Sequence, residues 1–243
     1  KCDNCHGGYD QPVEPAYNWR GSMMAQAARD PLFYACLAIA NQDAPESGDL
    51  CIRCHSPKGW LEGRSVPTDA SALTAQDREG VLCDFCHKMV RPTPLGTNPY
   101  AGDADYTAGT YAQDQSYLST LGQIPGTTAD GMYIADGNNS KRGPFVDANA
   151  THQMFYSPLH RESDLCGTCH DVSNPAYTKA GIGIYAPNVF GQPAPNFDPY
   201  SMFPIERTFS EWKMSAYNQP GGVYAPQFGG NKQYVSTCKD CHM

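Results

Sequence analysis

The chain has 243 residues and a formal net charge of −8 at pH 7, from 17 basic and 25 acidic side chains. This excess of negative charge argues against nucleic acid and anionic membrane surfaces as partners, because both are themselves negative. The longest apolar stretch, Leu32 to Ala40, is too short for a transmembrane helix, so we expect no membrane span.

A first helix is predicted over this apolar stretch and begins just ahead of it. Asp30 followed by Pro31 fits an N-cap and a first helical position, and residues 32–41 should continue the helix. Cys36 falls within it, and we expect it to be a small buried hydrophobic residue. A reactive or intermolecular thiol is the alternative.

Two further helices are predicted later in the chain. Thr74 and Asp77 resemble a capping box, with Asp in place of the usual Glu or Gln, and should open a helix that runs toward Cys83. Residues 209–218 also fit a helix, with Trp212 and the charged side chains on different faces.

Two regions are predicted to be irregular. Residues 91–150 are rich in Gly, Pro, Asp and Tyr, and a short hairpin is expected near residues 132–139. Residues 174–204 carry six prolines, a density that excludes a long helix. We therefore expect a mostly irregular fold with short α-helices and little β-structure, organised as a single domain over residues 1–243.

The pattern Cys-x-x-Cys-His occurs five times and uses ten of the eleven cysteines. The cysteines are Cys2, Cys5, Cys51, Cys54, Cys83, Cys86, Cys166, Cys169, Cys238 and Cys241, and the histidines are His6, His55, His87, His170 and His242. This is the spacing of c-type haem attachment. The two thiols form thioethers with the vinyl groups of one porphyrin, and the histidine ligates its iron. The sequence thus predicts five haem c groups.

Disulfide, zinc and thioredoxin-like sites fit the cysteine pattern less well. A disulfide framework would not place a histidine after every second cysteine. Zinc sites bring two Cys-x-x-Cys pairs to each metal, and five pairs cannot be shared evenly in this way. A thioredoxin-like motif usually occurs once, beside a βαβ pattern. With five haems in 243 residues, the core should consist largely of porphyrin, with short helices and loops around it.

The distal iron ligands are restricted by the number of histidines. Of seven histidines only His152 and His160 lie outside the motifs, so at least three haems need another sixth ligand. We predict His160 and His152 as distal ligands, although either could be a surface or propionate-bonded histidine. Methionine is the obvious substitute, and Met24, with Met23 as its rival, is the favoured candidate. The alternative for these methionines is core packing.

A weak internal repeat accompanies the motifs. The segments 19–24 and 212–217 both read Trp-x-x-Ser-x-Z on predicted helices. With its five motifs, the chain resembles the multihaem cytochromes c, broadly the group of c-type nitrite reductases and hydroxylamine oxidoreductases, in which Z is often a distal histidine. The resemblance implies Met24 as a distal ligand, whereas Tyr217 departs from the pattern.

These features predict electron transfer through a chain of haems, with no catalytic residues. The protein would act as a subunit of an extracellular cytochrome filament, a nanowire, or as a periplasmic electron carrier. Covalent haem attachment follows export, so a signal peptide was removed if the chain is exported. The motifs reach almost to both ends of the chain, which suggests processing or truncation. Expected partners are redox proteins, an extracellular acceptor, or further copies in a homo-oligomer or homopolymer.

An enzyme is the alternative function. A haem without a sixth ligand could bind and reduce nitrite, hydroxylamine or a similar small nitrogen compound. The nitrite reductases that the chain resembles generally carry a Cys-x-x-Cys-Lys catalytic motif, and this sequence has none. A third possibility is a structural subunit of a larger redox complex.

Overall fold

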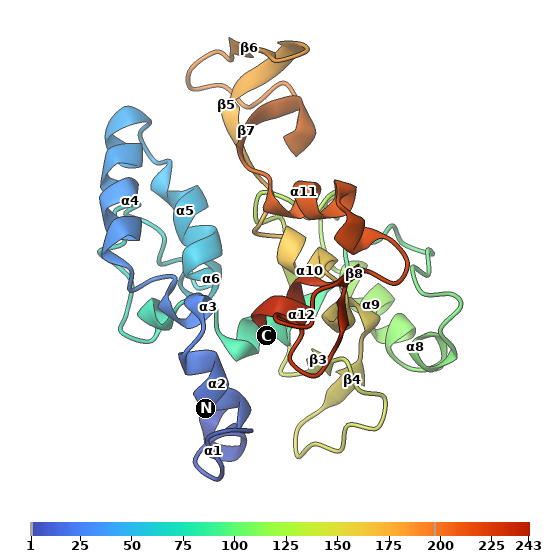
Figure 1. The fold of residues 1–243 in the computed structure, drawn as a ribbon. Coiled ribbons are helices and arrows are strands. Elements are labelled where there is room, and N and C mark those ends of the chain that lie inside the picture. The colour runs from blue at the N-terminus through green and yellow to red at the C-terminus, as the bar shows by residue number, and fades with distance from the viewer. Residues whose placement is uncertain (1, 197) are drawn as a thin grey trace. The chain divides into compact units, whose positions relative to one another are not determined.

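A computed structural model describes residues 2–196 and 198–243, and the chain divides into two compact units (Figure 1). We call Lys1–Lys88 the N-terminal unit and Met89–Met243 the C-terminal unit. The first three motifs lie in the N-terminal unit and the last two in the C-terminal unit. The assignment of all 243 residues to one domain stays a prediction.

The N-terminal unit is built of short helices. They are α1 (Asp3–His6), α2 (Pro15–Arg20), α3 (Met23–Gln26), α4 (Pro31–Asp43), α5 (Gly48–His55), α6 (Pro57–Leu61), the 3₁₀ turn η1 (Asp77–Glu79) and α7 (Cys83–Cys86). Helix α4 begins as predicted, because the Asp30 side chain accepts a hydrogen bond from the amide of Leu32 and Pro31 is the first helical residue.

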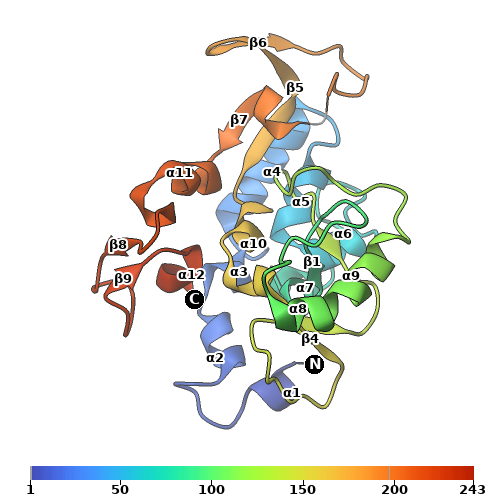
Figure 2. The same cartoon turned by 90° about the vertical axis from the view of Figure 1, so that its right-hand side faces the viewer.

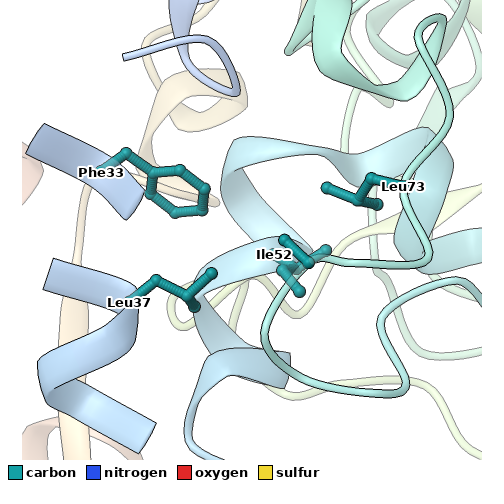
Figure 3. Close-up of a cluster of buried hydrophobic side chains, with 5 residues drawn as sticks. Phe33, Leu37, Ile52 and Leu73 are labelled. Carbon is teal, nitrogen blue, oxygen red and sulfur yellow. The ribbon is translucent and has the colours of Figure 1, made fainter. Parts of the chain in front are cut away.

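A small apolar core joins α4 to α5. Phe33 and Leu37 of α4 pack with Ile52 of α5 and with Leu73 of the loop after α6 (Figure 3). A fully buried side chain of this size contributes about 2 kcal/mol to stability. Cys36 is exposed, so the expectation that it is buried was wrong. The buried stripe of α4 runs through residues 33 and 37, four positions apart, and residue 36 lies beside it.

The predicted capping pair forms, but the helix does not. The Asp77 amide donates to Thr74 Oγ1 at 3.3 Å, and the Thr74 amide donates to Asp77 Oδ2 at 2.8 Å. Only one 3₁₀ turn follows, because Gly80, at φ 75°, ends it in a conformation that other residues avoid. The prediction of a helix reaching Cys83 was therefore wrong.

The C-terminal unit mixes short helices with small sheets. Its helical elements are α8 (Ala104–Ala108), α9 (Thr110–Leu118), η2 (Pro158–Arg161), α10 (Asp164–Gly167), η3 (Pro199–Ser201), α11 (Thr208–Met214), η4 (Ala216–Asn218) and α12 (Cys238–His242). Its strands are β1 (Met89–Val90), β2 (Ile134–Ala135), β3 (Lys141–Gly143), β4 (Met154–Tyr156), β5 (Val172–Gly181), β6 (Ile184–Pro187), β7 (Met202–Glu206), β8 (Val223–Tyr224) and β9 (Tyr234–Val235). The helix predicted over residues 209–218 is present only as far as Met214, where α11 ends; Ser215 is extended and the 3₁₀ turn η4 follows.

The predicted hairpin near residues 132–139 is absent from this part of the chain. Strand β2 pairs antiparallel with β1, whereas β3 pairs in parallel with β4. A buried ion cluster holds this connection: Arg142 donates to Asp114 at 2.8 Å and to Asp136 at 2.9 Å. Asp136 lies only six residues before Arg142, but Asp114 is 28 residues away, so the turn residues alone did not indicate the cluster.

The proline-rich region forms no long helix, as predicted, but contains the longest strand. Strand β5 lies between β6 and β7, and all pairs are antiparallel. Its register to β7 shifts between Asn174 and Thr178, around Pro175, which cannot donate to the ladder. The sheet extends away from α10, with β6 farthest (Figures 1 and 2). Short helices and irregular segments still make up most of the chain, as expected.

Candidate haem-attachment sites

Each of the five motifs overlaps a short helix: α1, α5, α7, α10 or α12. In the third motif His87 follows the end of α7, and in the fourth Cys169 and His170 follow the end of α10. Residues three and four positions apart share one face of a helix, so both cysteines and the histidine of a motif leave the same side. In the first, third and fourth motifs the histidine amide donates to the carbonyl of the first cysteine at 2.9, 2.9 and 3.0 Å. Each motif can therefore offer two sulfurs and an imidazole to one porphyrin.

The motif side chains are accessible as well as aligned. All ten motif cysteines are exposed or half-buried. His6, His170 and His242 are exposed, whereas His55 and His87 are half-buried. This arrangement fits covalent haem, because the thiols can be reached for thioether formation and the imidazoles for iron ligation.

The imidazole of His55 is held by the surrounding chain. Its Nδ1 lies 2.8 Å from the carbonyl oxygen of Ala27, and its ring stacks on Phe33 at a centroid distance of 4.2 Å. Because a carbonyl oxygen only accepts, Nδ1 must carry the proton, and Nε2 keeps its lone pair. Metal-bound histidines typically donate their other ring N–H to an acceptor in this way. His55 is thus oriented to ligate iron through Nε2.

Two motifs lie close together in each unit. In the N-terminal unit, burial raises the pKa of the Cys83 thiol, and Cys2 lies near enough to raise it further, so the first motif lies near the third. In the C-terminal unit, a hydrogen bond with Cys166 lowers the pKa of the Cys238 thiol to about 6. The Cys238 amide also donates to Ser163 Oγ at 3.0 Å, so the fourth motif lies beside the fifth.

Residues 1–88 match a protein family described as cytochrome c554 and c-prime. The matched segment is the N-terminal unit with its three motifs. The match supports a c-type cytochrome that binds haem c covalently and transfers electrons. Comparison with curated proteins and with solved structures found no match. Among the helices of the described residues, none combines the length and apolar character needed to cross a membrane.

When bound, haem c takes up and releases an electron at its iron. The chain's own residues determine where it is attached, which groups ligate the iron, and how close one attachment point lies to the next. The five motifs and the predicted distal ligands would hold the haems.

The predicted distal ligands occupy different environments. His160 of η2 is buried, with 6% of its surface exposed, and its carbonyl accepts a hydrogen bond from Lys239 in the fifth motif. His160 thus lies beside the fifth motif as well as six residues before the fourth. His152 is exposed, and its Nδ1 is 3.3 Å from the carbonyl of Gln153. Distal ligation by either histidine stays a prediction.

Of the two candidate methionines, Met24 is half-buried and Met23 is 81% exposed. The carbonyl of Met24 accepts the amide of Val81 at 2.9 Å, which places Met24 beside the segment leading into the third motif. Ligation by Met24 likewise stays a prediction.

Sequence reasoning missed the residue that fixes the backbone after the fourth motif. Asp171 is fully buried and accepts hydrogen bonds from Tyr200 at 2.8 Å, Ser210 at 2.7 Å and Arg207 at 3.2 Å. Its position directly after His170 was the only signal in the sequence. The network holds the end of this motif to η3 and α11.

Proposed function

We propose that this chain is a pentahaem c-type cytochrome that passes electrons along five covalently bound haems. The observation that carries the proposal is the set of five Cys-x-x-Cys-His motifs, each overlapping a short helix. On a helical turn this spacing puts both sulfurs and the imidazole on one side. The close approach of two motifs within each unit supports transfer between haems, because electron tunnelling requires short distances. The family match supports a c-type cytochrome.

We further propose that the chain is exported and works outside the cytoplasm. Thioether attachment of haem c follows export, and c-type cytochromes are typically exported. The net charge of −8 favours a basic redox protein, an extracellular acceptor or a copy of the same chain over a polyanion.

Between a filament subunit and a periplasmic carrier, we place the filament first. The β5–β6 hairpin and the loop after it expose Ile182 at 99%, Ile184 at 63% and Phe190 at 85%. Residues 174–196 carry one charged side chain, Lys179, in a chain of otherwise acidic character. An apolar, slightly positive hairpin is suited to contact an acidic copy of the chain.

Negative-stain microscopy of the purified protein tests the filament. Filaments under native conditions would support it. If only discrete particles were seen over a range of protein and salt concentrations, the filament would be contradicted and the periplasmic carrier would remain as the proposal.

One observation favours an enzyme as the second candidate: only two histidines lie outside the motifs. A haem whose sixth position stayed open could bind nitrite or hydroxylamine.

Electron paramagnetic resonance of the oxidised protein, with spins counted per haem, separates the two functions. Electron transfer predicts five low-spin haems, completed by His160, His152 and methionines. One high-spin haem per chain that shifts on addition of nitrite or cyanide would instead favour the enzyme.

A further inference from the structure

Trp19 in the N-terminal unit and Trp212 in the C-terminal unit make equivalent hydrogen bonds. Trp19 Nε1 donates to the carbonyl of Val81 at 2.9 Å, and Trp212 Nε1 donates to the carbonyl of Ser236 at 2.8 Å. Each acceptor lies two residues before the first cysteine of a motif, the third and the fifth respectively. The bonds span 62 and 24 residues, so neither belongs to a local turn.

The serines of the repeat are equivalent too. Ser22 Oγ donates to the carbonyl of Trp19 at 2.7 Å, and Ser215 Oγ donates to the carbonyl of Trp212 at 2.7 Å. Each serine is also the N-cap of the next turn, α3 or η4. The Trp-x-x-Ser repeat seen in the sequence is therefore also a repeat of structure.

In the N-terminal unit, the tryptophan helix α2 packs on the end of the first motif. A Cβ added to Gly7, the residue after His6, would lie 3.0 Å from the Cβ of Ala16 in α2. Glu14, the buried residue before α2, accepts the amides of Tyr9 and Asp10 at 2.9 and 3.1 Å. Helix α2 thus contacts the first motif, while Trp19 reaches the third.

In the C-terminal unit, the tryptophan helix α11 packs on the fourth motif. The Phe209 ring lies against Gly167, where an added Cβ would be 2.5 Å from the ring. The Phe209 amide donates to the carbonyl of His170 at 2.8 Å, and the Phe209 ring stacks on Trp212. Helix α11 thus contacts the fourth motif, while Trp212 reaches the fifth.

We propose that Trp19 and Trp212 are positioning residues that fix the spacing within two haem pairs. Trp19 would set the distance between the haems of the first and third motifs, and Trp212 the distance between those of the fourth and fifth. The chain then contains the same two-motif arrangement twice. The first and third motifs form one copy, in which the second motif is an insertion, and the fourth and fifth motifs form the other. This inference rests on the proposed function, because it requires haem at these four motifs.

The third tryptophan shows the difference between a local contact and a pairing contact. Trp60 Nε1 donates at 3.0 Å to the carboxylate of Asp49, which also lies two residues before a motif. This bond spans only 11 residues and supports the second motif from its own flank.

The test replaces each pairing tryptophan in the full haem-bearing protein. Trp19→Phe and Trp212→Phe keep an aromatic ring and remove the N–H donor. Charges on paired haems repel one another more strongly at shorter separation, so a change in spacing alters the reduction potentials of both members. A potentiometric titration followed by electron paramagnetic resonance should show two shifted haems in each variant, and a different two in each.

Two controls make the result specific. Tyr117→Phe removes a hydroxyl that donates to the carbonyl of Ala135 at 2.8 Å, a bond that includes no motif residue, and should leave all potentials unchanged. Trp60→Phe should shift one haem at most.

The intact mass of every protein is measured first. A parent protein with fewer than five haems refutes the proposed function, whatever the variants do. Five haems in the parent and unshifted potentials in both pairing variants refute the pairing role alone. If a phenylalanine variant loses haem, Ser22→Ala or Ser215→Ala is titrated instead, and unshifted potentials there count against the pairing role.

Discussion

The imidazole of His55 shows how much of a haem site one hydrogen bond can determine. Donation from Nδ1 to the Ala27 carbonyl sets the tautomer, and the Phe33 ring limits rotation. The sequence identified His55 as an iron ligand through its motif. It did not identify Ala27, because a backbone carbonyl acts as a partner whatever its side chain and is placed only by the fold.

Replacing His160 tests the strongest of the predicted distal ligands. If its imidazole completes one haem, His160→Ala leaves that iron without its sixth ligand, and one haem per chain becomes high-spin. Electron paramagnetic resonance of the oxidised variant measures this. His152→Ala is the parallel test of the second spare histidine. Five low-spin haems in His160→Ala would remove His160 from the ligand set.

The buried carboxylate of Asp77 should make the N-terminal unit sensitive to acid. Burial alone would raise its pKa, but hydrogen bonds from Arg64, at 2.6 Å to each oxygen, and from Thr74 hold it well below the usual range. Because the pKa of Asp77 is lower in the folded than in the unfolded protein, its carboxylate stabilises the fold at any pH above its unfolded-state pKa of about 3.9. This stabilisation is lost as the pH falls below that pKa.

Asp77→Asn should therefore destabilise the protein by about 3 kcal/mol at neutral pH, because it removes the buried charge that Arg64 binds at both oxygens, although Arg64 keeps its ion pair with Glu62. Denaturant unfolding between pH 7 and pH 3 should show a smaller loss of stability with acid than in the parent. Asp43→Asn, at an exposed position, is the control. If the stability of Asp77→Asn fell with acid as much as that of the parent, other groups would account for the acid sensitivity.

Among the secondary-structure elements, local signals predicted helix beginnings better than helix ends. Asp30 and Pro31 open α4, and the Thr74–Asp77 pair forms as a capping box should. The helix after Asp77 stops because Gly80 turns the backbone to φ 75°, against the carbonyl of Met24. That contact is tertiary, so the capping signal could not reveal where the element ends.

Gly80→Ala should destabilise the protein more than Gly63→Ala. Both glycines have positive φ, 75° and 76°. An added Cβ at Gly63 meets nothing within 4 Å, whereas at Gly80 it would lie 2.3 Å from the Met24 carbonyl oxygen. Gly63→Ala should cost about 1 kcal/mol from backbone strain alone. Denaturant unfolding compares the two, and equal losses would mean that the Met24 contact contributes nothing.

The strands were the least predictable elements. The turn residues near 137 suggested a hairpin, but the buried ion pairs of Arg142 hold this connection instead. Six prolines in residues 174–204 excluded a long helix correctly, yet β5 includes Pro175 because the ladder shifts around it. Sequence periodicity does not reveal such partners, because Arg142 also binds Asp114, 28 residues away, and the register of β5 depends on its pairing with β7.

Across the full chain, the two units repeat one set of contacts. In each, a tryptophan helix lies against one motif and donates to the segment before another. The match to residues 1–88 covers only the first of these units. The sequence indicated the repeat through Trp-x-x-Ser, but not that each tryptophan donates to a carbonyl two residues before a motif, because that contact depends on the fold.

Charging the exposed hairpin tests association between copies. If Ile184 and Phe190 contact an acidic neighbour, the double variant Ile184→Glu/Phe190→Glu should dissociate filaments, since it replaces apolar contacts with like-charge repulsion. Sedimentation velocity of parent and variant measures the size distribution. Leu95→Glu/Val146→Glu, at exposed positions elsewhere in the same unit, is the matched control. Equal association in both double variants would place the contact elsewhere.

If all five motifs carry haem, the intact mass of the mature protein must show it. Mass spectrometry under denaturing conditions removes any haem that is not covalently attached. We predict one species, heavier than the polypeptide by five haem groups. A mature protein with four or fewer would contradict the pentahaem assignment, and peptide mapping would identify the motif that stays unmodified.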